Sequence, residues 1–193
     1  MWIVFVVGLV GLLWFAFGYF YMLECCKDWG QVSRGDSFAE EGQYDMAIEE
    51  YDEAIRLERF HAEAYYKRGL AYEAIGKTIE AERDFEKAIQ VYDEATPLVL
   101  KGGTMVVVGN NPFYQRGLAY EALGKTIEAE RDFEKTIQWY DETILRLDSD
   151  LCQTAWCRSS AFYGRGLAYE ALGKTLEAER DFAKAKELGY VNP

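Results

Sequence analysis

Few side chains in this sequence are placed to do chemistry. His61 is the only histidine, and its position at a predicted helix junction is typical of a surface or turn residue. Cys152 and Cys157 lie five residues apart in a short linker, but a zinc site would need further cysteine or histidine ligands. A phosphate-binding glycine loop and a nucleophile motif are both absent from the sequence. The sequence therefore predicts no catalytic residue, metal site, cofactor or small-molecule substrate.

The four cysteines leave several states open. Cys25 and Cys26 follow a long apolar segment, where a cysteine can be acylated or remain a simple thiol. A disulfide between Cys152 and Cys157 requires the loop to fold back and an oxidising compartment. We expect reduced thiols at this second pair.

Arginines and acids recur at a fixed spacing in four stretches of the chain. In each stretch an acidic residue follows an arginine by sixteen residues, which fits an ion pair between the two helices of a hairpin. A guanidinium can bind a carboxylate through two parallel hydrogen bonds. We expect these pairs to be architectural, with ligand binding by the arginines as the alternative. The pairs are Arg34 with Glu50, Arg68 with Asp84, Arg116 with Asp132, and Arg165 with Asp181.

The elements that carry these pairs repeat along the chain. Residues 66–85, 114–133 and 163–182 have nearly the same sequence. Within one copy, apolar residues recur every three or four positions over residues 65–75 and again over 81–89, which predicts two amphipathic helices. Gly-Lys-Thr separates the two helices in each copy. The repetition therefore predicts stacked helical hairpins.

At these positions the chain resembles the tetratricopeptide repeat family. The family pattern is an aromatic residue, glycine and tyrosine on the first helix, followed by alanine and phenylalanine on the second. Its copies here are Tyr65, Gly69, Tyr72, Ala81 and Phe85; Phe113, Gly117, Tyr120, Ala129 and Phe133; Phe162, Gly166, Tyr169, Ala178 and Phe182; and a diverged Gly35, Phe38, Ala47 and Tyr51. The resemblance implies an all-α fold, a right-handed α-solenoid of about four hairpins preceded by one transmembrane helix.

The spacing between the repeats is uneven. Gly35 and Gly69 are 34 residues apart, whereas Gly69 to Gly117 spans 48 residues and Gly117 to Gly166 spans 49. The sequence Tyr-Asp-Glu at 51–53 returns at 92–94 and 140–142, about seven residues later relative to its repeat, and a heptad nearly preserves the helix face. We therefore expect lengthened second helices in repeats two and three. The predicted repeats, within a domain at 25–193, cover about residues 28–61, 62–109, 110–158 and 159–192.

Residues 2–23 contain no charged residue. About 20 apolar residues cross a bilayer as a helix, and Trp2, Tyr19 and Tyr21 fit interfacial anchors. A cleaved signal peptide would need a basic start and a small-residue cleavage site, which this segment lacks. We expect a retained anchor at residues 1–24. Lys27 and Arg34 follow it, which places the repeats on the cytoplasmic side of the membrane or its equivalent.

The chain is strongly acidic, with a formal net charge of −12. Binding to nucleic-acid phosphates depends on lysine and arginine, so this charge argues against a nucleic-acid partner. Attraction of the repeats to anionic lipid surfaces is disfavoured for the same reason.

The family resemblance implies a groove lined by the first helices, in which a peptide or partner helix binds. Leu70 and its equivalents stand where chaperone-binding members carry asparagine, which argues against a receptor for chaperone tails. Tyrosine and leucine edged by glutamate suit a basic or amphipathic peptide or helix. Alternatively, the tyrosines and leucines pack between repeats. The candidate groove residues are Tyr66, Leu70, Glu73, Tyr114, Leu118, Glu121, Tyr163, Leu167 and Glu170.

These features together predict a non-catalytic, membrane-anchored protein that mediates protein–protein interactions as an adaptor, scaffold or assembly factor. Two alternatives remain: a structural accessory subunit of a larger membrane complex, and a receptor for basic amphipathic targeting peptides. Little sequence follows Phe182, and stacked repeats need a capped end. Either Leu188, Tyr190 and Val191 close the array or another chain covers it.

Overall fold

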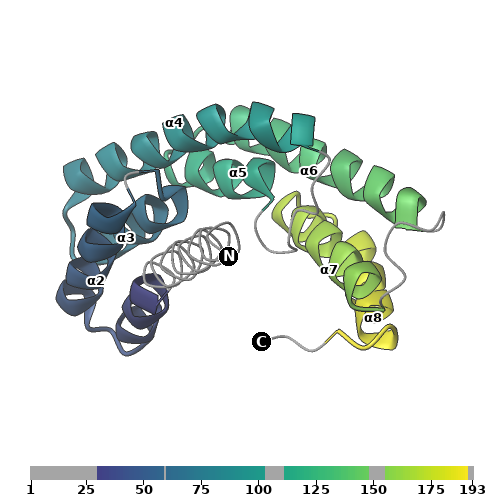
Figure 1. The fold of residues 1–193 in the computed structure, drawn as a ribbon, viewed down its shortest axis with the longest axis horizontal. Coiled ribbons are helices and arrows are strands. Elements are labelled where there is room, and N and C mark those ends of the chain that lie inside the picture. The colour runs from purple at the N-terminus through teal and green to yellow at the C-terminus, as the bar shows by residue number, and fades with distance from the viewer. Residues whose placement is uncertain (1–29, 59, 103–110, 148–154, 191–193) are drawn as a thin grey trace, which may run out of the picture. The chain divides into compact units, whose positions relative to one another are not determined.

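The computed structural model describes residues 30–58, 60–102, 111–147 and 155–190. Helices joined by short turns make up this described part, which contains no strand, so the predicted all-α fold is confirmed (Figure 1). A helical stretch at residues 30–40 precedes α2 (Tyr44–Leu57), α3 (Ala62–Ala74), α4 (Thr78–Gly102), α5 (Pro112–Ala122), α6 (Thr126–Leu147), α7 (Ala155–Ala171) and α8 (Thr175–Glu187).

The predicted anchor at residues 1–24 lies outside the described residues. Of the helices in the described part, none is both long enough and apolar enough to cross a bilayer.

Two compact units divide the chain between Asp84 and Phe85, so that α4 starts in the first unit and continues into the second. In the first unit α2 packs on α3. In the second unit α5 packs on α6, α6 on α7, and α7 on α8. Each of these helices therefore contacts its neighbour in the chain, as expected for stacked hairpins.

A glycine in the left-handed conformation ends the first helix of each hairpin. The φ angles of Gly76, Gly124 and Gly173 are 76°, 67° and 69°. At the second of these turns the N–H of Gly124 donates to the carbonyl of Glu121 (2.8 Å), and the N–H of Lys125 donates to that of Tyr120 (2.9 Å). These two bonds form a Schellman motif, which satisfies the last carbonyls of the helix. The recurring Gly-Lys-Thr thus sets the turn between the two helices.

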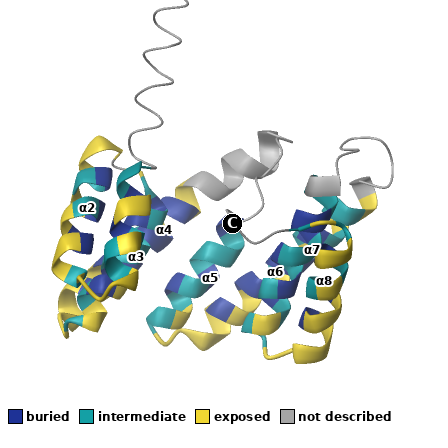
Figure 2. Cartoon of the chain, turned by 90° about the horizontal axis from the view of Figure 1, so that it is seen from below, coloured by how far each residue is buried: buried dark blue, intermediate teal, exposed yellow. Residues whose placement is uncertain are grey.

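A second glycine lets the two helices of a hairpin approach closely. A Cβ atom added at Gly117 would lie 2.6 Å from the ring of Phe133, and one at Gly166 would lie 2.6 Å from the ring of Phe182. The ring of Phe133 is almost completely buried. Buried residues gather between the paired helices, whereas exposed residues follow the outer side of α8 (Figure 2).

The added residues of repeats two and three are helical. The helices α4 and α6 contain 25 and 22 residues, compared with 14 in α2 and 13 in α8. At about 1.5 Å per residue, a seven-residue insertion lengthens a helix by roughly 10 Å.

Within the described residues, Tyr190 packs back on the last hairpin. The Tyr190 ring stacks on the Tyr163 ring, with centroids 4.3 Å apart and planes inclined by 20°. Lys186 is exposed at the position that holds the buried Ile89 in α4 and the buried Ile137 in α6. α8 therefore carries an exposed charge at a position that is apolar and buried in α4 and α6. Val191 lies outside the described residues.

We expect Gly117→Ala to destabilise the protein by about 1–3 kcal/mol, because the new methyl group would overlap the buried Phe133 ring. The matched control is Gly30→Ala, where an added Cβ meets nothing within 4 Å. Alanine is the better helix former by about 1 kcal/mol, so this control should unfold at equal or higher urea concentration. Equal unfolding midpoints for Gly117→Ala and the unmodified protein would contradict the close-packing argument.

Candidate functional site

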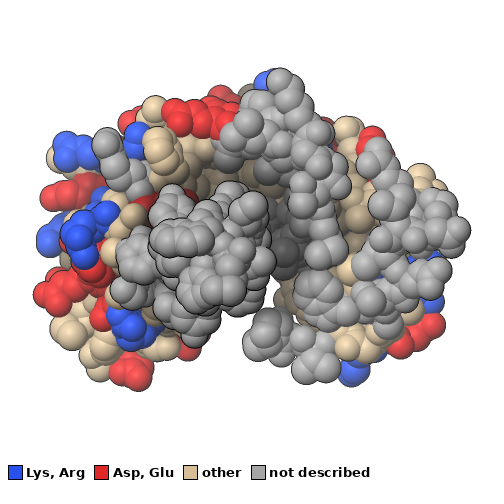
Figure 3. Space-filling view, viewed as in Figure 1, with Lys and Arg blue, Asp and Glu red and all other residues tan. Residues whose placement is uncertain are grey.

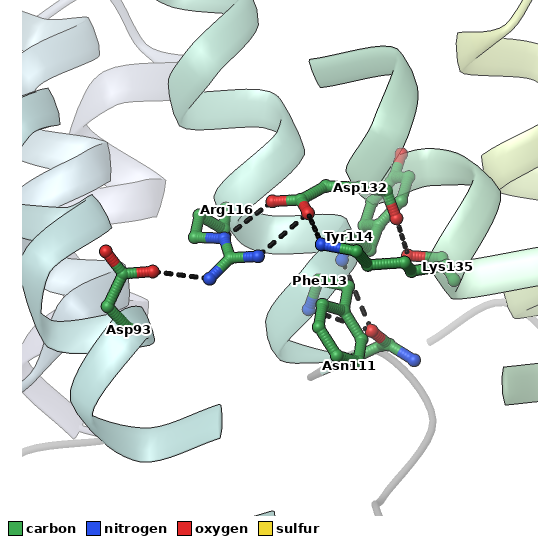
Figure 4. A network of polar contacts seen from close by, with 8 residues as sticks. Asp93, Asn111, Phe113, Tyr114, Arg116, Asp132 and Lys135 are labelled. Atoms are coloured by element: carbon green, nitrogen blue, oxygen red, sulfur yellow. Dashed lines mark hydrogen bonds and ion pairs between the residues drawn. The ribbon is translucent and has the colours of Figure 1, made fainter. Parts of the chain in front are cut away.

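Arg116 on α5 holds carboxylates from two other helices. Its Nε donates to Oδ2 of Asp132 (2.5 Å) and its Nη2 donates to Oδ1 of the same residue (2.8 Å), so α5 is joined to α6. The remaining nitrogen, Nη1, donates to Asp93 on α4. Figure 4 shows the guanidinium lying between the two carboxylates. One side chain thus connects three helices.

The same arrangement occurs at two further arginines. Arg165 on α7 binds Asp181 through Nε (2.6 Å) and Nη2 (2.7 Å), and its Nη1 donates to Asp141 on α6 (2.6 Å). Arg68 on α3 binds Asp84 at 2.6 and 2.7 Å and also donates to Asp52 on α2. We call each of these groups an arginine node: an arginine, the aspartate of its own hairpin, and an aspartate of the preceding second helix.

The arginines of the nodes are shielded from water. Their side chains are 17% (Arg68), 11% (Arg116) and 18% (Arg165) exposed. Aromatic rings cover them, and the Arg165 guanidinium carbon lies 5.3 Å from the centroid of the Phe162 ring. The hydrogen bond to Asp132 raises the pKa of Arg116 above its ordinary value, so this side chain is charged at any usable pH.

Arg34 in the first hairpin is different. It contacts Glu50 through Nε (3.1 Å) and Nη2 (3.0 Å), but its side chain is 55% exposed. The structure thus brings together all four arginine–acid pairs that the sixteen-residue spacing predicts. The three node aspartates from preceding helices, Asp52, Asp93 and Asp141, were not predicted.

A sequence signal for those three aspartates exists. Each follows the tyrosine of the recurring Tyr-Asp-Glu. On α6, Asp132 and Asp141 are nine residues apart, about two and a half helical turns, so the two carboxylates point to opposite sides of the helix. On α2, Glu50 and Asp52 are two residues apart and also face roughly opposite ways. The spacing on α6 is thus one heptad longer than that on α2. A heptad moves the second carboxylate along the helix axis and nearly keeps its direction.

The nine candidate groove residues form three sets, each on one side of a first helix. On α5 they are Tyr114, Leu118 and Glu121, which follow one another at intervals of four and three residues. The corresponding sets are Tyr66, Leu70 and Glu73 on α3, in the first unit, and Tyr163, Leu167 and Glu170 on α7, in the second.

The tyrosines of the second unit pack inside their own hairpins. The rings of Tyr114 and Phe133 have centroids 5.7 Å apart, and those of Tyr163 and Phe182 are 5.5 Å apart. Tyr163 also carries the stacked Tyr190. These contacts give both tyrosines a packing role and leave them only partly exposed.

The glutamate of each set is open to solvent, and the leucine is exposed or partly exposed. Leu70 is 40% exposed, and Leu118 and Leu167 are partly exposed. All three glutamates are exposed, and none forms an ion pair with another described residue. The three Leu–Glu faces, Leu70 with Glu73, Leu118 with Glu121 and Leu167 with Glu170, therefore present an apolar side chain beside an unneutralised carboxylate.

The diverged first hairpin does not share this face. Asp36 stands at the position of Leu70, and its carboxylate accepts hydrogen bonds from Lys67 (2.6 Å) and from the Tyr51 hydroxyl (2.8 Å). Burial, reinforced by the bond to Asp36, raises the pKa of the Tyr51 hydroxyl.

The residues that first suggested chemistry have structural roles. His61 caps α3 by accepting a hydrogen bond at Nδ1 from the N–H of Ala64 (3.4 Å). Cys157 is disulfide-bonded, so the expectation of a reduced thiol is wrong at this residue. The other three cysteines lie outside the described residues, and a five-residue spacing does not reveal how the intervening loop runs. Within the described part, no cluster of three or more potential metal ligands occurs.

Family models match most of these hairpins. One described as "TPR repeat" matches residues 35–76, and two described as "Tetratricopeptide repeat" match residues 62–95, and residues 112–143 and 159–188. Together they cover more than half of the chain. This is a tetratricopeptide repeat protein. Tetratricopeptide repeat proteins are in general interaction modules without catalysis, so this protein mediates contacts between proteins. The unmatched residues 96–111 include the last turns of the lengthened α4.

Several solved structures are similar to this tetratricopeptide repeat protein. The crystal structure of MamA is 26% identical, covering 82% of this chain and 75% of that one, with a TM-score of 0.37. The second TPR of Spaghetti (RPAP3) bound to the HSP90 peptide SRMEEVD is 34% identical (55% and 86% covered, TM-score 0.35). The second TPR domain of human RPAP3 with the HSP70 peptide SGPTIEEVD is 24% identical (84% and 98% covered, TM-score 0.37). Among curated proteins, none matches the chain.

The two aspartates of one arginine node should differ in their effect on stability. Asp132 is buried, so Asp132→Asn removes the main partner of a shielded guanidinium, and we expect a loss of about 3 kcal/mol. Asp93 is 53% exposed, and Asp93→Asn should cost about 1 kcal/mol or less. Urea unfolding of the two variants measures both values. Equal losses would show that burial does not decide the strength of these pairs.

Proposed function

We propose that this tetratricopeptide repeat protein is a membrane-anchored adaptor that binds a basic, amphipathic peptide or helix on its first helices. The observation that supports it is the unpaired, exposed glutamate beside a partly exposed leucine on each of α3, α5 and α7. A leucine followed by a glutamate one turn later offers an apolar contact and a carboxylate on one helix side. A partner helix with apolar and basic residues on one side, three or four positions apart, complements both.

The division of charge in the structure supports this selection. The acids of the arginine nodes are bound by guanidinium groups, whereas Glu73, Glu121 and Glu170 have no cation to neutralise them among the described residues. On the face seen in Figure 3, acidic side chains mix with basic ones over the coloured residues. The unpaired glutamates thus add to the net charge of −12 at the positions where a ligand would lie.

An acidic ligand fits these faces poorly. The peptides named with the RPAP3 structures, SRMEEVD and SGPTIEEVD, carry several carboxylates. On this chain such a peptide would meet Glu121 on α5 and Glu170 on α7 rather than a lysine or arginine. Like charges in such proximity repel each other. We therefore propose a basic partner.

The anchor completes the proposal. Residues 2–23 have the length and composition of a single membrane span, and tethering restricts the repeats to the neighbourhood of partners at the same membrane. An accessory subunit of a membrane complex would use the same anchor but hold its partner permanently. A receptor for basic targeting peptides would use the same glutamates but release its ligand.

Replacing Glu73, Glu121 and Glu170 together by glutamine should weaken binding of a basic amphipathic helical peptide about tenfold, because each Leu–Glu face loses the carboxylate that attracts it. Fluorescence anisotropy with a labelled lysine–leucine peptide measures the affinity. The control variant carries glutamine at Glu82, Glu130 and Glu179, which are equally exposed on the second helices. Similar affinities for the two triple variants would rule out selection by the Leu–Glu faces.

The full-length chain should remain with membranes after alkaline carbonate extraction, and a variant lacking residues 1–24 should be released. Blue native electrophoresis of the extracted full-length chain then distinguishes the modes of action. A free chain whose peptide binding weakens with salt supports the adaptor or receptor, whereas a fixed stoichiometric assembly supports the accessory subunit. Release of the full-length chain by carbonate would remove the anchor from the proposal.

A further inference from the structure

The helix at residues 30–40 exposes a surface whose equivalents on α3, α5 and α7 are covered by the preceding second helix. On α3, α5 and α7 the arginine of the node donates Nη1 to an aspartate from the preceding second helix. For Arg34 no described residue supplies this aspartate, and its side chain is 55% exposed instead of 11–18%. The Nη2 of Arg34 donates a hydrogen bond to Gln31, on its own helix.

The residues around Arg34 show the same contrast. The position two residues after the close-packing glycine is Ala71, Ala119 or Ala168 in the later hairpins, with exposures of 3%, 0% and 0%. Ala71 belongs to the apolar cluster formed with Tyr51 and Ala54 of α2, the preceding second helix. In the first hairpin this position is Ser37, which is exposed and donates to the Ser33 carbonyl of its own helix (3.1 Å).

The occupant of this surface in the later hairpins is known from the structure itself. The preceding second helix brings a buried tyrosine and, next to it, the aspartate that reaches the arginine: Tyr51-Asp52, Tyr92-Asp93 and Tyr140-Asp141. Tyr140 lies so close to α7 that a Cβ at Gly164 would be 2.4 Å from its hydroxyl oxygen. Three instances thus define what fits beside such an arginine: a helix with an aromatic residue followed by aspartate.

The chain does not supply this helix to Arg34. The donated aspartates lie 16, 23 and 24 residues before their arginines. The corresponding positions before Arg34 are Gly18, Gly11 and Val10, and residues 2–23 contain no acid. A second copy is also unsuitable, since α8 has no Tyr-Asp and carries the exposed Lys186, which would repel Arg34.

We propose that the Arg34 surface, formed by Ser33, Arg34 and Ser37, docks an acidic helix of another protein in which an aromatic residue precedes an aspartate. The aspartate accepts a hydrogen bond from Arg34, and the aromatic ring packs beside the small Ser33 and Ser37 side chains. This docking is independent of the Leu–Glu faces and selects the opposite charge. It would extend the stack of helices beyond the first hairpin by the contact that already joins the later ones.

The probe is a free peptide with the sequence of Thr126–Leu147, which contains Tyr140-Asp141. A cross-link between solvent-facing positions holds it as a helix, and circular dichroism checks that it is helical. Fluorescence anisotropy measures its affinity for the full-length chain in detergent. We expect saturable binding that Arg34→Glu weakens at least about tenfold, as does Asp141→Asn in the peptide. A peptide with Asp141→Arg should restore binding to the Arg34→Glu chain. The control Arg83→Glu makes the same charge change at an exposed arginine and should bind like the unmodified chain.

Two results would overturn the docking proposal. One is a helical peptide that does not bind, or that binds the Arg34→Glu and Arg83→Glu chains equally. The other is binding that appears only after residues 1–23 are removed, since the chain's own segment would then cover the surface. Either result leaves the Leu–Glu faces untouched, because their probe is basic and their control residues lie elsewhere.

Discussion

The shielded guanidinium of each arginine node is the constraint on which the arrangement of helices depends. A charge removed from water is costly unless its hydrogen bonds are met, and Arg116 meets them with one carboxylate from its own hairpin and another from the helix before it. A bidentate pair fixes both the distance and the orientation of the two helices that it joins. The node therefore fixes how the two helices of a hairpin pair, and its second aspartate adds a contact with the preceding second helix.

Part of this arrangement could be predicted from the sequence, since a sixteen-residue interval between Arg116 and Asp132 stays constant from hairpin to hairpin. Asp93 and Asp141 escaped prediction because their distance to the arginine includes a loop and an added heptad, so no single interval recurs. The role of Tyr163 was equally hidden. Its exposure depends on Phe182 and on Tyr190, and the approach of these rings is set by the packing of α8. The regular spacing thus revealed the ion pairs within each hairpin, but neither the ion pairs between hairpins nor the ring contacts of Tyr163.

The structure also divides the acidic residues by function. Carboxylates such as Asp132 and Asp181 are buried and bound, and their charge is used up in holding helices together. Glutamates such as Glu121 are solvated and available to a ligand. These pairs cancel in the net charge, so the proposed recognition rests on the exposed, unpaired carboxylates. The two proposed surfaces, at the Leu–Glu faces and at Arg34, thus differ in the charge of the partner that they would select.

The lengthened second helices carry a consequence for how such an array can change its size. A second helix has to present one carboxylate to its own hairpin and another, on the opposite side, to the next. Adding one residue would rotate the second carboxylate by about 100°, and adding two or three would leave it pointing well away from its arginine. Seven residues rotate it by only about 20°. An insertion is therefore accommodated best when it is close to a whole number of turns, as are the seven added residues of α4 and α6.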